Sequence, residues 1–165
     1  MAGRTARLLH APCPNHYLGR YKFRCIALRR KGVLNGGMSK TILVADDSAT
    51  MRLMVRQLLE GRYSEVAVHE AIDGVDAIEE TLGPDLILMD FSMPRLNGLE
   101  AAAAIKKAMA DTPIIMFTVH ADALVPLCAA IGVDVISKPE GIPRLLERVD
   151  ALFPPTMAAK AARAG

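Results

Sequence analysis

Five side chains that can bind a cation or a phosphoryl group lie at the ends of short apolar runs in this sequence: Asp46, Asp47, Asp90, Thr118 and Lys138. Carboxylates that lie close together resist ionisation unless a cation joins them. Two or three carboxylate oxygens with room for water suit Mg²⁺, which completes its shell readily with phosphate oxygens. An aspartate can also accept a phosphoryl group covalently. The set therefore suits phosphoryl transfer if the fold brings its members together.

Apolar runs alternate with helical patterns from Thr41 onward, which is typical of strand and helix units repeated around a parallel sheet. We expect five strands, at TILVA (41–45), VAVHEA (66–71), DLILM (85–89), PIIMF (113–117) and VDVIS (133–137). In a doubly wound α/β fold of this kind, ligands bind outside the carboxyl ends of the strands. The five polar residues should then meet at one edge of the sheet.

Five helices should connect and flank these strands. Apolar residues between Met51 and Leu59 recur at helical spacing, and Asp73 can cap a helix from about Gly74 to Leu82. Further helices are expected at 98–110 and from Ile142 to Leu152, before Pro154 and Pro155. Between 122 and 132 we expect a helix that Pro126 makes short or late in starting, because proline is tolerated only in a first turn.

At the expected edge, each side chain has a chemical role to offer. Asp90 follows a strand that reads as core and is placed to be the nucleophile. Lys138 can neutralise phosphoryl oxygens, and Thr118 can donate a hydrogen bond to one of them. A single aspartate after a strand is usually a cap or turn residue, so the argument depends on the whole set.

Four separated motifs resemble the receiver domains of two-component response regulators: ILVADDS (42–48), LILMDFSMPRLNG (86–98), MFT (116–118) and SKP (137–139). The resemblance covers roughly residues 40 to 153. It implies a flavodoxin-like receiver fold, with five parallel strands in the order 2-1-3-4-5 and five flanking helices. It also implies a single-domain response regulator, similar to the stand-alone chemotaxis messengers.

The same resemblance assigns roles to individual residues. Asp90 would be phosphorylated by a histidine kinase or phosphotransfer protein, and phosphorylation would alter binding to a downstream protein target. The Mg²⁺ ligands would be Asp47 and Asp90 directly, Asp46 through water, and the backbone carbonyl of Ser92. Thr118 and Lys138 would contact the phosphoryl group. The peptide bond between Lys138 and Pro139 is expected to be cis, as in many members of the family.

Three departures from the family pattern limit what the resemblance implies. Val135 occupies the position where many receivers have a switch aromatic residue. Val119 follows the threonine where a smaller residue is usual, and could narrow access to Asp90. The segment from Thr118 to Lys138 is slightly shorter than usual, in agreement with an abbreviated fourth helix. Partner choice is therefore not given by the resemblance.

The charge of the chain divides it into unlike parts. Residues 1–37 contain eight basic and no acidic residues, whereas the remainder contains 12 basic and 18 acidic ones. We expect a receiver domain at 38–154 and a flexible tail at 155–165. The extension 1–37 is expected to be disordered or an artefact of start-codon assignment, because Met38 begins MSKTILVADDS, a natural start for a receiver.

Potential ligands in the extension do not form a recognisable site. The spacing of His10, Cys13, His16 and Cys25 matches no common zinc module. Three cysteines do not resemble a disulfide framework, which favours a reducing, cytoplasmic location. No apolar run approaches the roughly 20 residues that span a bilayer, so membrane insertion is not expected.

Two other functions compete with a phosphorylation-switched binding module. One is a phosphatase or phosphotransferase with an aspartyl-phosphate intermediate, but Ser92 stands where a second acid would be needed, and no insertion large enough for a lid is visible. The other is DNA binding through the basic run at 29–31, which would depend steeply on salt. Nucleic acid is the less favoured partner, because such runs are usually solvated.

Overall fold

The computed structural model describes residues 40–80 and 83–153. These form one parallel sheet of five strands in the order β2-β1-β3-β4-β5. The strands are β1 (Lys40–Ala45), β2 (Val66–Ala71), β3 (Leu86–Met89), β4 (Ile114–Thr118) and β5 (Asp134–Ser137). The predicted doubly wound fold and strand order are confirmed, and each strand begins and ends within one residue of its expected position.

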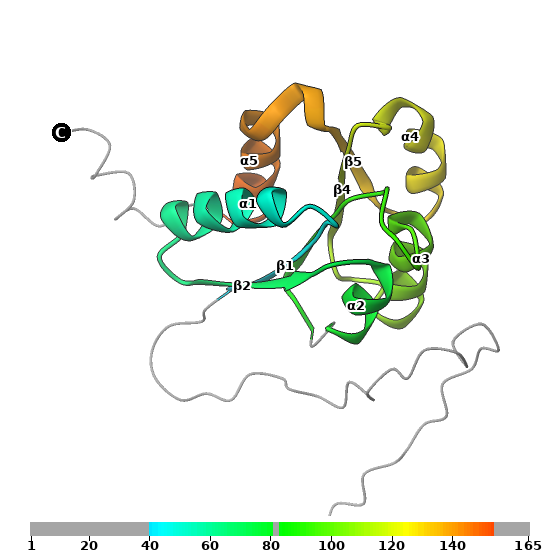
Figure 1. Cartoon of the computed structure of the whole chain (residues 1–165), viewed down its shortest axis with the longest axis horizontal. Helices are drawn as coiled ribbons and strands as arrows, with labels where there is room; N and C mark the ends of the chain where they lie inside the picture. Colours follow the sequence, from blue (N-terminus) through cyan, green and yellow to red (C-terminus); the bar gives the residue numbers. More distant parts are fainter. Residues whose placement is uncertain (1–39, 81–82, 154–165) are drawn as a thin grey trace, which may run out of the picture.

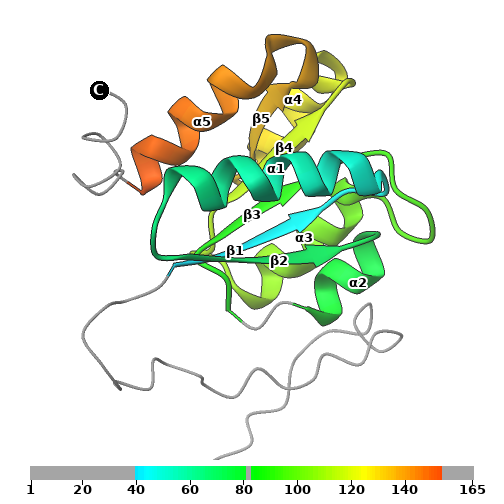
Figure 2. The same cartoon turned by 60° about the vertical axis from the view of Figure 1, so that its left-hand side comes forward.

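Helices cover both faces of the sheet (Figures 1 and 2). On one face lie α1 (Ala49–Arg62) and α5 (Gly141–Leu152). The other face is covered by α2 (Gly74–Glu79), α3 (Gly98–Ala108) and α4 (Ala121–Ala130). A 3₁₀ turn, η2 (Lys138–Glu140), joins β5 to α5. The second helix ends earlier than the expected Leu82, which lies outside the described residues.

Aliphatic side chains build most of the two core layers, one on each face of the sheet. Because side chains alternate along a strand, Ile42 and Val44 of β1 face α1 and α5, whereas Leu43 and Ala45 face α2 and α3. All four residues of β3 are buried, as expected for a central strand covered on both faces. The polar residues from Asp90 onward therefore follow directly after a fully buried strand.

Short polar side chains fix the starts of three helices near the carboxyl edge of the sheet. Ser48 caps α1, Asp73 caps α2 and Asn97 caps α3, each by accepting hydrogen bonds from backbone N–H groups of the first turn. The cap of α2 at Asp73 confirms the sequence prediction. All three helices thus begin where the strands end, which holds the connecting loops in defined positions.

The expectation for the fourth helix was wrong. The helix α4 begins at Ala121 and continues for 10 residues through Pro126. Proline at this position removes the N–H that would bond to the carbonyl of Asp122. Both residues lie on the exposed side of the helix, where water can satisfy that carbonyl, while Leu124 and Cys128 pack into the core on the opposite side. Packing of the buried side therefore outweighs the lost bond.

The expectation of a cis bond before Pro139 was also wrong, because the described residues contain no cis peptide bond. Pro139 lies within η2, near its first position. A trans proline with its fixed φ suits the first turn of a helix, so the local helical path accounts for the trans form.

Other sequence predictions lie outside the described residues. These are the extension at 1–37, with its histidines, cysteines and basic run, and the tail at 155–165. The proposed domain boundaries therefore stay predictions. Within residues 40–80 and 83–153, no helix is long and apolar enough to span a membrane.

Candidate functional site

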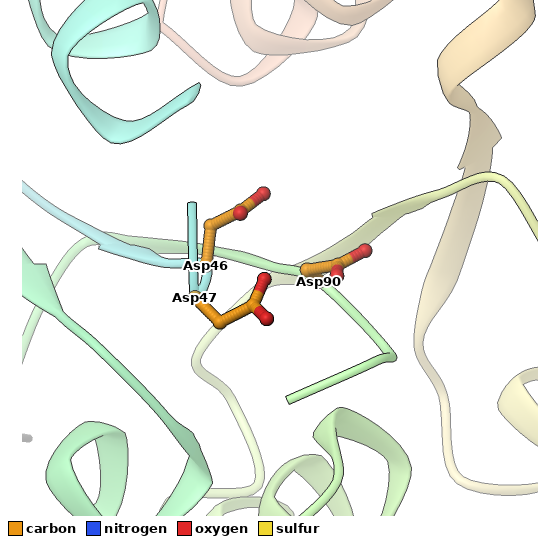
Figure 3. Close-up of side chains that lie close together, drawn as sticks. All are labelled: Asp46, Asp47 and Asp90. Atoms are coloured by element: carbon orange, nitrogen blue, oxygen red, sulfur yellow. The ribbon is translucent and has the colours of Figure 1, made fainter. Parts of the chain in front are cut away.

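Three carboxylates meet at the carboxyl edge of the sheet, where β1 and β3 end side by side (Figure 3). The register pairs Ala45 with Met89, and the N–H of Asp90 donates to the carbonyl of Ala45 at 2.8 Å. This pairing places the residues that follow the two strands next to each other. One oxygen each from Asp46, Asp47 and Asp90 lies within 4.8 Å of the others. The predicted convergence of the three aspartates is confirmed.

Their environments differ. Asp46 and Asp90 are buried, with 4% and 6% of their surface exposed, whereas Asp47 is exposed. The carboxylate of Asp46 accepts a hydrogen bond from the N–H of Ser48 at 2.9 Å and another from the Lys138 ammonium. Among the described residues, no side chain pairs with the carboxylate of Asp47. One member of the group is therefore open to solvent and the other two lie beneath it.

Lys138 joins the two buried carboxylates. Its Nζ lies 2.9 Å from Oδ2 of Asp46 and 3.1 Å from Oδ1 of Asp90. It reaches them from the end of β5, across the end of β4, where Nζ lies 6.0 Å from the centre of the Phe117 ring. Burial alone would lower the pKa of Lys138, but the hydrogen bonds to Asp46 and Asp90 outweigh it and raise the pKa. The amine therefore stays charged at neutral pH.

Thr118 ends β4 at the same edge of the sheet and is completely buried. Its Oγ1 accepts a hydrogen bond from the N–H of His120 at 3.3 Å. Within residues 40–80 and 83–153, Thr118 makes no hydrogen bond to the three carboxylates. The structure thus places Thr118 on the expected edge, and its contact with a phosphoryl group stays a prediction.

The loop after Asp90 is shaped by a close approach of backbone to backbone. Gly98 begins α3, and a Cβ at this position would lie 1.9 Å from the carbonyl oxygen of Asp90. The N–H of Gly98 also donates to the carbonyl of Phe91 at 2.9 Å. Only glycine allows this contact, which folds the loop back beside Asp90. Ser92 is exposed within the loop, and its role as a backbone ligand stays a prediction.

A second ion pair ties this loop to the neighbouring one, and the sequence did not indicate it. Asp73 is buried at the start of α2 and pairs with Arg95 of the loop before α3. Arg95 has a φ of 60°, a conformation that residues other than glycine adopt rarely. The N–H of Gly74 also donates to the carbonyl of Leu96 at 3.2 Å. These contacts hold the loop that follows Asp90 against α2.

Arg52 is a second residue that the sequence did not indicate. It lies on α1, and its guanidinium donates to the backbone carbonyls of Asp46 and Asp47. Its position four residues after the cap Ser48 was the available signal, because a side chain in the first turns of a helix can reach back to the preceding loop. The site therefore includes a basic group on each side: Lys138 contacts carboxylates, and Arg52 contacts the backbone that carries them.

Two of the three departures from the family pattern are single residues, and these two lie in different surroundings. Val119 is 60% exposed just beyond Thr118. Val135 of β5 is half-buried and packs against the core layer that contains α3 and α4. On the face of the sheet that α4 covers, the position where many receivers have a switch aromatic residue is therefore occupied by the smaller Val135.

The three carboxylates and Lys138 fit a hard divalent cation. Three ionised carboxylates against one ammonium leave two negative charges uncompensated, and the exposed position of Asp47 leaves room for water. One oxygen of each carboxylate lies within 4.8 Å of the others, so Asp46, Asp47 and Asp90 would together hold such an ion. Oxygen ligands with space for water are the combination that Mg²⁺ prefers.

Comparison with known proteins gives consistent results. The model of the response regulator receiver domain matches residues 42–150. The chain is 35% identical over 117 residues to the chemotaxis protein CheY of Bacillus subtilis, covering 68% of this chain and 97% of that protein. It is 34% identical over 122 residues to a protein-glutamate methylesterase/protein-glutamine glutaminase of Thermotoga maritima, covering 66% of this chain but only 36% of that protein.

A solved structure with the same fold contains a metal complex. The response regulator TrrA of Thermotoga maritima, determined in complex with Mg²⁺-BeF, superposes with a TM-score of 0.62 at 28% identity. The match covers 69% of this chain and 99% of that one.

Proposed function

Because this chain belongs to the response regulator receiver domains of two-component signalling, we propose that Asp90 is its phosphoacceptor. The donor is a phosphorylated histidine of a kinase or phosphotransfer protein. The reaction depends on Mg²⁺, and the output is altered binding to a protein target. The chain spans only 36% of the methylesterase relative, so the activity of that protein is not transferred to this one.

The observation that carries the proposal is the Lys138 ammonium placed between Asp46 and Asp90, with Asp47 open beside them. A phosphoryl group brings further negative charge to a position next to carboxylates, so cations must compensate it. Lys138 supplies one positive charge from a fixed position. Mg²⁺ held by Asp46, Asp47, Asp90 and the carbonyl of Ser92 would supply the rest when bound.

In the transfer step, an oxygen of Asp90 forms a bond to phosphorus and the bond from phosphorus to the donor imidazole nitrogen breaks. The imidazole leaves with the electron pair of that bond and takes a proton. Asp90 is buried in an ordered loop, so its attacking oxygen is already oriented. Once Asp90 carries the phosphoryl group as an acyl phosphate, Lys138 is free to turn from the Asp90 carboxylate towards a phosphoryl oxygen, where Thr118 adds a hydrogen bond.

Phosphorylation would act as a switch because it changes the charge balance of an edge from which β4 and β5 lead into α4 and α5. A partner that prefers one state shifts the equilibrium between the two. Val135 offers little bulk to bury, so we do not assign the switch to an aromatic residue. Similarity over 97% of CheY from Bacillus subtilis supports a messenger that acts through protein binding.

The test is covalent labelling with a small phosphoryl donor such as phosphoramidate, followed by intact mass measurement. We expect one added phosphoryl group in the presence of Mg²⁺, none with EDTA, and none in Asp90→Ala. Asp111→Ala is a suitable control, because Asp111 is exposed in the loop that precedes β4, at the opposite end of the sheet. Undiminished labelling of Asp90→Ala would refute the assignment.

A phosphatase or phosphotransferase remains the alternative, and the geometry favours it less. The cavity that reaches Asp46 and Asp90 has a volume of about 10 Å³ and is lined mainly by apolar side chains, so it does not form a pocket that would enclose an organic substrate. Ser92 offers no second acid next to Asp90. Sustained turnover of p-nitrophenyl phosphate, lost in Asp90→Ala, would support this alternative over a signalling role.

A further inference from the structure

Arg52 connects three elements at the site edge of the sheet. Its Nη1 donates to the carbonyl of Asp46 at 2.8 Å and, more weakly, to the carbonyl of Asp47 at 3.4 Å. Its Nε donates to Oε2 of Glu70 on β2 at 3.0 Å. Only 12% of the Arg52 side chain is exposed. One guanidinium thus ties the loop before α1 to the end of the neighbouring strand.

Asp46 and Asp47 depend on the contacts of Arg52 to different degrees. Asp46 is held in several other ways, because its N–H donates to Ala71 and its carboxylate accepts from Ser48 and Lys138. Asp47 has an exposed carboxylate, and its backbone follows directly after the carbonyl that Arg52 binds most closely. Among the described residues, Arg52 is the side chain that hydrogen-bonds to the backbone of Asp47. The position of the exposed carboxylate therefore depends on Arg52.

Glu70 is shared with a second arginine, and this offers a comparison within the same helix. Arg56 lies one turn after Arg52, and its Nε is 2.8 Å from Oε1 of Glu70, an ion pair without hydrogen-bond alignment. Its Nη2 donates to the carbonyl of Val68 at 3.3 Å. Arg56 therefore has the same acidic partner and the same charge, but among the described residues it makes no hydrogen bond or ion pair with the loop that carries Asp46 and Asp47.

We propose that Arg52 is a positioning residue for the cation site. It binds the backbone of the acidic pair, so that the carboxylate of Asp47 stays within reach of those of Asp46 and Asp90. It touches neither the phosphoryl group nor the ion. This inference rests on the proposed function, because the cation whose affinity Arg52 sets is the Mg²⁺ of the transfer reaction.

The physical basis is the cost of ordering ligands at the moment of binding. A loop that is already fixed loses little conformational freedom when the ion binds, whereas a loose loop loses more and binds the ion more weakly. Groups that orient metal ligands typically contribute about 10- to 100-fold to metal affinity. Because Asp46 keeps its other contacts, we expect the lower end of this range for Arg52.

Titration calorimetry of the full chain with Mg²⁺ tests the inference. We expect Arg52→Gln to raise the Kd for Mg²⁺ about 10-fold, and Arg56→Gln to leave it close to that of the unsubstituted chain. Arg52→Lys should lie between the two, because an ammonium cannot bind the carbonyls and Glu70 through one planar group. Equal Kd values for Arg52→Gln and Arg56→Gln would overturn the inference and leave Arg52 as a structural ion pair.

A second measurement separates positioning from general loss of structure. Amide hydrogen exchange in EDTA should become faster at Asp47 and Ser48 in Arg52→Gln, and stay unchanged at Val44 in the middle of β1. If Arg52→Gln does not fold, the same measurement on Arg52→Lys decides the matter, and unchanged exchange at Asp47 and Ser48 would overturn the inference. Absence of Mg²⁺ binding to the unsubstituted chain would instead contradict the proposed function.

Discussion

The two ends of the sheet both hold carboxylates next to basic groups, but in different proportions. At the carboxyl end, one lysine pairs with Asp46 and Asp90, and the third aspartate, Asp47, has no basic partner among the described residues. At the opposite end, where α1 and α5 finish (Figure 2), the carboxylate of Asp150 accepts hydrogen bonds from Arg62 and from Tyr63, whose hydroxyl oxygen lies 2.5 Å from Oδ1. In this group one carboxylate faces one guanidinium, and both carboxylate oxygens have donors.

This difference separates a binding site from a structural tie. A carboxylate whose oxygens all have donors gains little from a further cation, so the contacts of Asp150 can only stabilise the packing of α1 against α5. Excess negative charge with an exposed member attracts a cation and loses stability without one. The same residue types thus serve different purposes, depending on how many acids share each base.

The largest effect is expected from Lys138→Gln. Loss of the ammonium leaves three carboxylates without a basic partner, and we expect the free energy of unfolding in EDTA to fall by about 2 kcal/mol, less than for a fully buried pair because the edge meets solvent. Phosphorylation of Asp90 should slow by about 100-fold, since a fixed charge is lost from the transferred group. Urea denaturation and the labelling rate give the two values.

Mg²⁺ sharpens this prediction, because a bound ion can replace part of the missing charge. Millimolar Mg²⁺ should therefore stabilise Lys138→Gln more than the unsubstituted chain. Lys107→Gln, at an exposed position near the end of α3, is the control for loss of a positive charge elsewhere. If Mg²⁺ stabilised Lys138→Gln and the unsubstituted chain equally, the carboxylates would not be the ion's ligands.

A smaller effect on stability, and none on phosphorylation, is expected from Asp150→Asn. The amide keeps the shape of the side chain but loses the charge that binds Arg62, which should lower the free energy of unfolding by about 1.5 kcal/mol. Mg²⁺ should not restore the free energy of unfolding that Asp150→Asn loses. The exposed pair of Asp134 with Arg148 offers a control, since Asp134→Asn should cost less than about 0.5 kcal/mol. Slower phosphorylation of Asp150→Asn would contradict the conclusion that Asp150 only stabilises packing.

The smallest effect concerns the titration of Tyr63. Burial raises the pKa of its hydroxyl first, and the hydrogen bond to Asp150 raises it further. Since the folded chain favours the neutral phenol, this contribution to stability is complete below the ordinary value of about 10 and is lost as the pH rises above it. In Tyr17→Phe/Tyr21→Phe, Tyr63 is the remaining tyrosine, so ultraviolet absorbance of tyrosinate reports it alone.

We expect no ionisation of Tyr63 in the folded chain at pH values where free tyrosine is half ionised. Adding Asp150→Asn to the same chain should shift the midpoint downward, because the neighbouring negative charge disappears. An unchanged midpoint would show that burial acts alone and that the hydrogen bond adds nothing to this end of the sheet.

Much of the fold could be predicted because its signals are local. Runs such as LILM at 86–89 are short and fully apolar and alternate with helical patterns, which favours buried strands, and caps such as Asp73 are recognised by residue type. The length of the helix around Pro126 and the isomer of the bond before Pro139 were mispredicted because their signals are not local. Whether a proline is tolerated depends on which side of the helix faces solvent and on the path of the following turn, and neither is a property of the neighbouring residues.

The sequence by itself determined which residues end the strands and therefore that Asp46, Asp47, Asp90, Thr118 and Lys138 share one edge. The tertiary structure decided the contacts and the exposure of each residue. Lys138 binds two buried aspartates, Asp47 is exposed, and Arg52 binds the backbone of the acidic pair. Strands distant in sequence become neighbours in the order β2-β1-β3-β4-β5. Distances across that sheet, on which charge interactions depend, exist only once it has folded.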